Sequence, residues 1–542
     1  MLFNSYEFIF AFLPVTLVAF YILGARSRTW SLHWLILASF FFYAWWRPFN
    51  VLLIAPSILI NFILARILQR LAVNENRRKT SLAVLVVGIV FNVMFLGYFK
   101  YSYFLGSAIN DVFGANLALT QVILPLGISF ITFQKIAFLV DVHGGRVPSF
   151  TLRDYGLFVL FFPQLIAGPI VHYREMMPQF HRVSCRPDKE NFSVGLALFV
   201  FGLFKKVVLA DGIAEHVSPI YDFAAAGHTV SLLPAWFAAI GFTLQIYFDF
   251  SGYTDMALGL ARFFGVRLPA NFNSPLKATS IIDFWLRWHM TLTRFLTAYL
   301  YNPLALWLTR RRMAKGLPGL GGPTPSVGAF FQLLVGPLLL TMFVSGFWHG
   351  AGYQFILWGL LHGLYLSINH AWRLFGPKIW ASKEAYDRFM RPTGLALTFL
   401  AVAVSMVLFR SPNTEVAKEL LQGMAGLNGI GLPQRLLALL GPLPGFLPFV
   451  KASAGMSVRE LATVAAWLGA LLLGALALPN TLEVMARYEP ALGVRATPTA
   501  PRSPLSVLGW TPTIPWALAM SCLVIAAVIQ LGGKSEFLYW QF

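Results

Sequence analysis

Charged residues are scarce in this sequence. Only 12% of its 542 residues are Asp, Glu, Lys or Arg, whereas 57% are hydrophobic and the mean hydropathy is +0.67. A soluble globular protein carries about a quarter charged residues, so the composition excludes that class. Apolar runs close to the roughly 20 residues that a helix needs to cross a membrane recur along the chain. They are 8–24, 31–46, 51–70, 81–99, 153–170, 192–213, 231–248, 327–347, 352–369, 394–409, 461–478 and 515–531.

Cysteine and the common catalytic motifs are also nearly absent. The two cysteines, Cys185 and Cys522, exclude a disulfide framework and a site built from several thiolates. No HxxxH, HExxH or Cys/His pairing predicts a metal site. The chain has no G-x-S-x-G elbow and no Walker loop, so neither a serine hydrolase nor an ATP-driven pump is supported.

The scarce charges are unevenly distributed. Lys and Arg number 41 against 22 Asp and Glu, which gives a net charge of +19. The basic residues concentrate in short segments between apolar runs, namely 25–30, 71–80, 309–326 and 373–392. This is the positive-inside pattern, so these segments are predicted to be cytoplasmic and the N-terminus to lie outside. Anionic lipid headgroups, and no nucleic acid, are the expected partners of this charge.

The apolar runs predict an all-α polytopic membrane protein with about eleven to thirteen membrane helices. The first run follows no Lys or Arg and precedes no A-x-A site, so we expect a retained helix. Residues 1–542 form one integral domain, with insertions at 411–460 and 481–513 and an aromatic tail at 534–542. The motif TEVAKELLQGM in the first insertion predicts a short amphipathic helix lying on the membrane surface.

Polar residues interrupt three of the apolar stretches. These are LPLGISFITFQKIAFLVDVHGG at 124–145, TLQIYFDFSGYTDM at 243–256 and SIIDFWLRWHMTLTRFLTAYLYNP at 280–303. Ionisable groups inside a membrane are costly, and they usually face a protein interior or a wet cavity. The sequence therefore predicts a polar cavity or tunnel at the centre of the helices, with Asp255 facing inward beside a partner.

Among ten histidines, His289 and His349 stand in distinctive surroundings. Each follows a Trp inside an aromatic, helix-length segment, where a neutral imidazole can accept a proton as a general base. Gly346, Gly350 and Gly352 would let a substrate approach the backbone beside His349. The alternative for either histidine is a hydrogen-bonded residue of the core.

The motifs, taken together and in order, resemble the membrane-bound O-acyltransferases, and specifically their bacterial alginate O-acetyltransferase branch. They are LPLGISFITFQKIAFLVDVHGG, LIAGPIVHYREMMPQF, GLFKKVVLAD, YFDFSGYTDMALGLARFFG, NFNSPLKATSIIDFWLRWHMTLTRFL, SGFWHGAGYQFILWGLLHG and EFLYWQF. The resemblance implies a ring of tilted helices around a thin centre, with a tunnel that joins the two faces of the membrane. It places the catalytic histidine at His349 and a second, upstream polar position at His289.

The resemblance also implies the chemistry. An acyl group, most simply acetyl, passes from a cytoplasmic thioester such as acetyl-CoA to a hydroxyl, with no bound cofactor. Extracytoplasmic acetyltransferase partners then place it on an exported polysaccharide, so a bacterial inner membrane is the expected location. The stabiliser of the oxyanion is open between Trp348, Arg287 and Asn302, while Tyr253 and Asp255 are expected to line the tunnel.

The tail GGKSEFLYWQF admits two interpretations. It is either an aromatic anchor at the membrane interface, or a carrier in which the phenol of Tyr539 takes the acyl group. The position of Tyr539 past Gly532 and Gly533 would let its hydroxyl reach a tunnel that opens on the outer side. The resemblance implies the same role, since relatives with a similar terminal tyrosine are proposed to work in this way.

Two other functions remain open at this stage. A transporter of a small polar solute or glycan would use the same polar centre, although the inverted repeat common in secondary transporters is missing. Within the family, D-alanyl transfer to cell-wall polymers is the alternative to acetyl transfer. The tail fused to this chain favours the acetyl branch.

Overall fold

The computed structural model describes residues 1–72, 75–120, 122–320, 326–380, 382–439, 450–452, 457–493, 508–533 and 538. Helices dominate this part of the chain and confirm the predicted all-α class. The first helices are α1 Leu13–Arg26, α2 Arg28–Ala44, α3 Phe49–Ala72, α4 Arg78–Leu96, α5 Ser102–Phe113 and α6 Ile128–His143. Then come α7 Leu152–Leu160, α8 Phe162–Leu165, α9 Tyr173–Arg182, α10 Lys189–Phe204, α11 Asp211–Ala225 and α12 Leu232–Phe263.

The second half of the chain continues in the same way. Its helices are α13 Ile281–Trp285, α14 Met290–Leu296, α15 Asn302–Met313, α16 Val327–Phe330, α17 Gly336–His349, α18 Tyr353–Phe375, α19 Lys383–Arg410, α20 Thr414–Met424, α21 Gln434–Leu439, α23 Val458–Ala477, α24 Thr481–Val484 and α25 Ile514–Gln530. Short π and 3-10 segments join or extend them: η1 Glu7–Phe12, η2 Glu75–Arg77, η3 Gly97–Tyr101, η4 Lys205–Ala210, η5 Pro275–Lys277, η6 Thr297–Tyr301, η7 Phe331–Val335, η8 Gly376–Ile379 and η9 Ala486–Tyr488. Strand β1 Ile430–Leu432 pairs in parallel with β2 Val450–Ala452.

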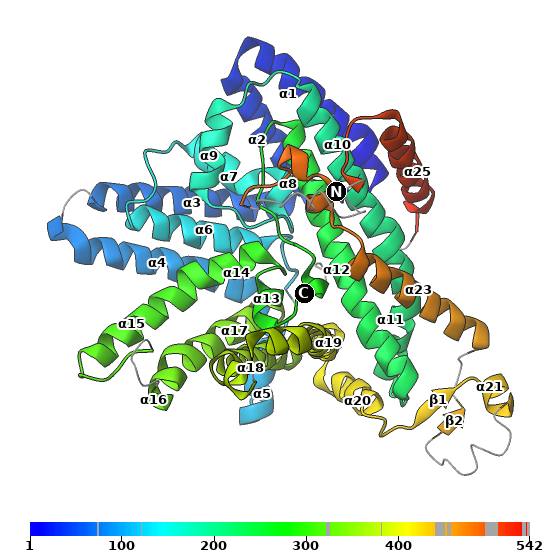
Figure 1. Cartoon of the computed structure of the whole chain (residues 1–542). Helices are drawn as coiled ribbons and strands as arrows, with labels where there is room; N and C mark the ends of the chain where they lie inside the picture. Colours follow the sequence, from blue (N-terminus) through cyan, green and yellow to red (C-terminus); the bar gives the residue numbers. More distant parts are fainter. Residues whose placement is uncertain are drawn as a thin grey trace.

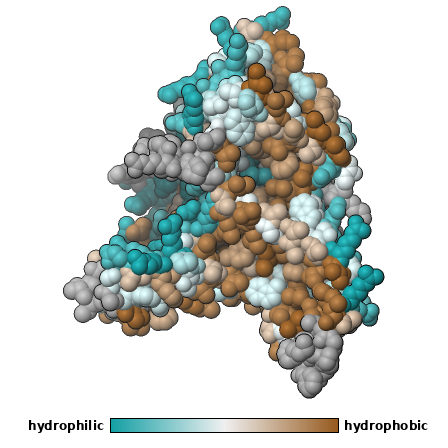
Figure 2. Space-filling view, turned by 45° about the vertical axis from the view of Figure 1, so that its right-hand side comes forward, coloured by the Kyte–Doolittle hydropathy of each residue, from teal (hydrophilic) through white to brown (hydrophobic). Residues whose placement is uncertain are grey.

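Within the described residues, eight helical stretches are long and apolar enough to cross a membrane. Others, such as α2 with 17 residues and α6 with 16, are shorter but pack among them. Helices α3, α4 and α6 form one layer. On the other side of the molecule α10 and α11, joined end to end through η4, run along the long helix α12 (Figure 1). The surface of the helices is largely hydrophobic in Figure 2. The chain is a multi-pass membrane protein.

Helix α12 is the central helix of the fold, and glycines hold α10 close against it. A Cβ on Gly202 would overlap the carbonyl oxygen of Gly252, and a Cβ on Gly259 would overlap that of Gly195. Two contacts of backbone against backbone, seven residues apart on each helix, replace side-chain packing here. Small residues commonly allow membrane helices to approach one another in this way.

The carboxylates of α12 form ion pairs with lysines of η4, the segment that continues α10, and do not face lipid. Lys206 contacts Asp249 at 2.6 Å and Asp211 at 2.7 Å, and Lys205 contacts Asp255 at 2.7 Å. A buried charge without a partner is costly in a membrane, so these pairs explain how α12 tolerates its carboxylates. The inward position predicted for Asp255 is confirmed.

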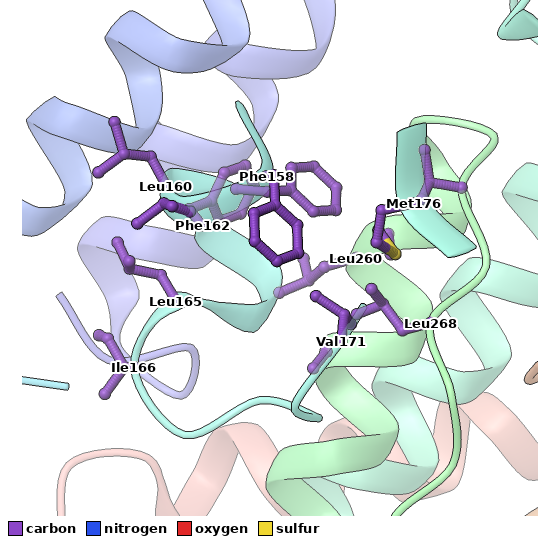
Figure 3. Close-up of a cluster of buried hydrophobic side chains, with 14 of the residues drawn as sticks. Phe158, Leu160, Phe162, Leu165, Ile166, Val171, Met176, Leu260 and Leu268 are labelled. Atoms are coloured by element: carbon purple, nitrogen blue, oxygen red, sulfur yellow. The ribbon is translucent and has the colours of Figure 1, made fainter. Parts of the chain in front are cut away.

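The short helices α7, α8 and α9 pack on the end of α12 through an apolar cluster (Figure 3). Phe158, Phe162, Met176, Leu260 and Leu268 are fully buried within it. The cluster fixes the loop between α8 and α9, in which Ile170 forms hydrogen bonds with Thr291 and Arg294 of α14.

The helix predicted for TEVAKELLQGM is α20. It is capped by Asn413, and its apolar face packs against α12. Its position on the membrane surface stays a prediction. Leu420 is fully buried, and Trp236 Nε1 donates to the carbonyl of Met424 at 3.1 Å. An amphipathic pattern predicts that a helix has an apolar face, but it does not predict which part of the protein or membrane covers that face.

Candidate functional site

His349 is the last residue of α17, where the chain turns sharply into α18. Its imidazole lies among three aromatic rings, those of Trp348, Trp358 and Phe409, with centroid distances of 4.9, 5.1 and 5.1 Å. Only 7% of the residue is exposed. The predicted histidine is therefore enclosed by aromatic side chains at the end of a helix.

The glycines around His349 serve packing, which differs from the role expected from the sequence. A Cβ on Gly346 would overlap the carbonyl oxygen of Phe355 in α18, and one on Gly359 would overlap that of Met342 in α17. A Cβ on Gly350 would overlap the ring of Phe355. These glycines bring α17 and α18 together, so the room that they leave is filled by the chain itself.

Lys100 supports the end of α17, and sequence reasoning missed it. Its Nζ donates to the carbonyls of Trp348 at 2.6 Å and His349 at 2.9 Å, while Tyr101 Oη donates to that of Phe347 at 2.7 Å. A cation suits the negative end of a helix and satisfies its last carbonyls. The available signal was a single charged residue, Lys100, within the otherwise uncharged stretch 81–110.

His289 begins α14 from an unusual backbone conformation. Its φ is +41°, in the left-handed region that a residue with a side chain rarely adopts. The bond from Met290 N–H to the carbonyl of Asn271 at 2.9 Å helps to hold it. Such strain persists where the surroundings enforce it, often at functional sites.

Hydrogen bonds to Asn271 decide the tautomer of His289. The Oδ1 atom of Asn271 accepts from Thr291 N–H at 3.3 Å and from Thr291 Oγ1 at 2.5 Å. The hydroxyl of Thr291 is directed there because its oxygen already accepts from Ile170 N–H at 2.9 Å. His289 Nδ1, 3.3 Å from the same Oδ1, must then donate, so the lone pair of the neutral ring lies on Nε2.

The two histidines share a neighbour. The ring centroid of Trp348 lies 6.4 Å from that of His289 and 4.9 Å from that of His349. Trp348 also stacks on Phe133 at 4.9 Å. The structure thus brings His289 and His349, which are 60 positions apart in the chain, next to the same indole.

A cavity adjoins each histidine. A cavity of about 680 Å³ lies beside Gly350, the residue after His349. One of about 500 Å³ lies beside Met290, the residue after His289. The first is lined in part by Tyr103 of α5 and Arg410 of α19, and the second by Ala270 after α12. The two cavities are thus lined by different parts of the fold, and each includes the residue that follows one of the two histidines.

Of the other predicted site residues, one lines a cavity and the others form contacts elsewhere. Asn302 lines the cavity beside Met290. Arg287 forms an ion pair with Asp283 at 2.8 Å, and Tyr253 stacks on Phe3 at 4.7 Å. Neither Tyr253 nor Asp255 lines either of the two cavities.

The indole nitrogen of Trp348 is a candidate hydrogen-bond donor for the reaction. This atom, Nε1, is buried and has no hydrogen-bond partner among the described residues. This N–H is a donor held beside both histidines, as a stabiliser of negative charge would require.

His362 is a third buried histidine nearby, and its contacts are structural. Trp285 Nε1 donates to its Nδ1 at 3.3 Å, so its Nε2–H donates to Ser405 Oγ at 2.9 Å. In the part of the chain that the structure describes, no group of three His, Cys, Asp or Glu residues could hold a metal ion.

Tyr539 lies outside the described residues, so its predicted role rests on the sequence. Its neighbour Leu538 is described and is fully buried. Leu538 belongs to the same hydrophobic cluster as Trp358 and Phe409, which surround His349, and Phe250, which contacts His289. At Leu538 the tail is thus part of the core, whereas an anchor at the membrane interface would leave it outside.

Comparison with known proteins adds independent findings. The family model described as "MBOAT, membrane-bound O-acyltransferase family" matches residues 146–316. The chain is 40% identical to a peptidoglycan O-acetyltransferase of Helicobacter pylori, over 80% of this chain and 81% of that protein. It is 33% identical over the full length of both chains to the probable alginate O-acetylase AlgI of Pseudomonas aeruginosa. A teichoic acid D-alanyltransferase of Bacillus subtilis is 26% identical over 52% of this chain.

Proposed function

Because this chain belongs to the membrane-bound O-acyltransferase family, we propose that it moves an acetyl group across a membrane for O-acetylation of an exported polysaccharide. The chain is an O-acyltransferase with multiple membrane helices. The acyl donor in this proposal is a cytoplasmic thioester, acetyl-CoA or another acyl thioester. Extracytoplasmic acetyltransferase proteins receive the group, and the enzyme resides in a bacterial inner membrane.

The observation that carries the proposal is that His349 and His289 both lie beside Trp348, while the residue that follows each of them lines a separate cavity. An enzyme that takes a group from one face and delivers it to the other needs access from both. A transporter would need the cavities but not a pair of buried imidazoles between them in the chain's core.

The positions of the basic segments indicate which side of the membrane each cavity faces. Helix α19 begins within the basic segment 373–392 and ends with Arg410, which lines the cavity near His349. That cavity thus lies opposite the basic segments, and we assign it to the extracytoplasmic side. The other cavity follows the end of α12, where Tyr21, close to the basic Arg26, donates to the carbonyl of Phe263. We assign it to the cytoplasmic side.

In the proposed reaction His349 takes the proton of the acceptor hydroxyl, and the oxygen attacks the thioester carbonyl. The C–S bond breaks, the thiolate receives the proton, and an ester and a free thiol result. Trp348 Nε1 donates to the carbonyl oxygen as it gains charge. His289, held in one tautomer by Asn271, orients the donor.

Acetyl transfer is favoured over D-alanyl transfer by the extent of similarity. The relatives named for O-acetylation reach 33–40% identity over 80–100% of this chain. The D-alanyltransferase matches only 52% of it, at 26% identity. The fused tail of this chain agrees with that preference.

The test is thioester cleavage by the full-length protein in nanodiscs with radiolabelled acetyl-CoA. His349→Gln should lower the rate of acetyl transfer by about 10²- to 10⁴-fold, as expected for loss of a general base, with normal insertion and thermal stability. His33→Gln, an exposed histidine in α2, is the matched control and should retain full activity. A His349→Gln protein that is folded and active, or a wild type that cleaves no thioester, contradicts the proposal.

A further inference from the structure

We infer that the cavity between α1 and α9 binds the phosphate of an anionic phospholipid headgroup, and that Arg182 and Arg186 recognise this phosphate. The inference concerns a lipid site and goes beyond the proposed function, on which it does not depend. Its basis is a cavity that has a basic rim and an aromatic floor.

This cavity has a volume of about 420 Å³. Residues of α1 and α9, the first turn of α10 and the segment after α12 form its wall. None of them lines the cavity beside Gly350 or the cavity beside Met290. The volume falls within the range of small-ligand sites, roughly 300–1,000 Å³. The cavity is therefore a separate site with room for a lipid headgroup.

Arg182 and Arg186 are the charged residues of the cavity wall. Both are exposed, and neither forms an ion pair with another residue that the structure describes. The two carboxylates that follow them in the chain face other groups. Asp188 accepts from the N–H of Asn191 at 2.9 Å, and Glu190 lies 3.8 Å from a guanidinium at the end of α12. A basic wall without a counter-charge attracts anions.

The backbone that carries the two arginines is fixed to the neighbouring helices. Cys185 is buried, and it packs so closely on α1 that a Cβ on Gly24 would overlap the Cβ of Cys185. The φ of Cys185 is +50°, in the left-handed region that a residue with a side chain rarely adopts. Arg28 donates to the carbonyl of His181 and so connects the end of α9 to the start of α2. The rim of the cavity is therefore formed before a ligand binds.

The floor of the cavity is aromatic, which favours a lipid over a free phosphate ion. Phe20 and Phe264 are buried there, with ring centroids 5.0 Å apart. Phe192 of α10 is 36% exposed, and its ring centroid lies 6.0 Å from that of Tyr21 in the cavity wall. The apolar surface thus continues from the cavity onto the exposed side of α10. A phospholipid presents the same combination, a charged phosphate next to apolar chains.

The cavity also lies at the level where lipid headgroups are expected. Phe20 and Tyr21 shortly precede the basic segment 25–30, which is predicted to be cytoplasmic. Earlier side chains of α1, such as Val15 and Val18, are exposed and apolar, as expected of a surface that faces lipid. Basic pockets between membrane helices on the cytoplasmic side are typical sites for anionic headgroups. Guanidinium groups pair well with phosphate oxygens.

The experiment titrates lipid into the full-length protein in delipidated detergent micelles and counts bound lipids by native mass spectrometry. Phosphatidylglycerol is compared with phosphatidylcholine, which carries the same phosphate but no net charge. We expect the first phosphatidylglycerol to bind at least about tenfold more tightly than the first phosphatidylcholine. Sodium phosphate at the lipid concentration is the third probe and should not displace phosphatidylglycerol. Equal binding of the two lipids overturns the inference, as does displacement by sodium phosphate, which would identify a site for a free anion.

Variants of the two arginines test the assignment. The double variant Arg182→Gln, Arg186→Gln should lower the affinity for phosphatidylglycerol by about tenfold and remove its preference over phosphatidylcholine. The double variant Arg182→Lys, Arg186→Lys should keep part of that preference. The control is Arg310→Gln, Arg311→Gln, which removes the same charge from two exposed arginines of another basic segment, at the end of α15. It should bind phosphatidylglycerol as the wild type does.

Thermal unfolding of the same preparations gives a second measurement. Phosphatidylglycerol should raise the Tm of the wild type and of the α15 control, because a ligand that binds only the folded state stabilises it. It should raise the Tm of the glutamine variant of the cavity less. A folded glutamine variant that keeps the preference for phosphatidylglycerol overturns the inference. An equal loss in the α15 control also overturns it, since net charge alone would then attract the lipid. If the glutamine variant does not fold, the comparison of the two lipids on the wild type decides the question.

Discussion

Removal of the Asn271 side chain should impair catalysis by releasing His289, and the structure allows the size of the effect to be worked out. In Asn271→Ala the buried donors on Thr291 N–H, Thr291 Oγ1 and His289 Nδ1 lose their acceptor, at 3.3, 2.5 and 3.3 Å respectively. A buried donor left without a partner costs about 1–3 kcal/mol. Two of these bonds are long, so we expect the free energy of unfolding to fall by about 2–4 kcal/mol.

The effect on the reaction exceeds the effect on stability. Without Asn271 the proton of the neutral His289 ring can occupy either nitrogen, and the left-handed backbone at φ +41° loses a side-chain contact. We expect kcat to drop by about 10²-fold, at the lower end of what a misplaced acid–base group costs. Asn271→Asp keeps an acceptor oxygen and removes only Nδ2, which has no partner among the described residues. It should therefore retain more activity than Asn271→Ala.

The assay combines kcat and KM for acetyl transfer with thermal unfolding of the same preparation. Asn273→Ala is the matched control, because this nearby residue bonds Asn480 at 2.9 Å and does not contact His289. A folded Asn271→Ala protein with normal kcat would refute the tautomer argument. So would equal losses of kcat in Asn271→Asp and Asn271→Ala.

Three further predictions follow, the first from the sequence and the other two from the structure. Tyr539→Phe should abolish both polysaccharide acetylation and any acetyl adduct on the C-terminal peptide, measured by mass spectrometry; full activity would eliminate the carrier role. Gly346→Ala should lower stability by about 1–3 kcal/mol through overpacking and lower activity with it, whereas Gly469→Ala, where nothing lies within 4 Å, should be neutral or stabilising. Burial, followed by the charge of Arg294, holds the pKa of His172 below its usual value. The unfolded chain therefore takes up a proton that the folded chain resists, and stability should fall as the pH drops below about 6.5; thermal unfolding of His172→Gln should show a flatter pH dependence, and an unchanged one would contradict this.

Much of the architecture could be predicted because a membrane makes composition decisive. Long apolar runs with few charges can fold only as helices within lipid, so the class followed from the sequence. The sequence also singled out His289 and His349, because each follows a Trp in an apolar segment, and the structure places both beside Trp348; their catalytic roles stay predictions. The inward position of Asp255 followed from the cost of exposing a carboxylate to lipid.

What surrounds the site was decided by contacts between distant segments, which local patterns do not encode. Lys100 donates a hydrogen bond to the carbonyl of His349, which lies 249 positions away in the chain. No local pattern around either residue predicts this contact. The glycines beside His349 suggested room for a substrate, but only the path of α18 shows that Phe355 fills it. In the same way α20 was predicted as an amphipathic helix, and the tertiary structure alone shows that its apolar face meets α12. The sequence specifies which faces must be buried, whereas the packing of the whole chain determines what buries them.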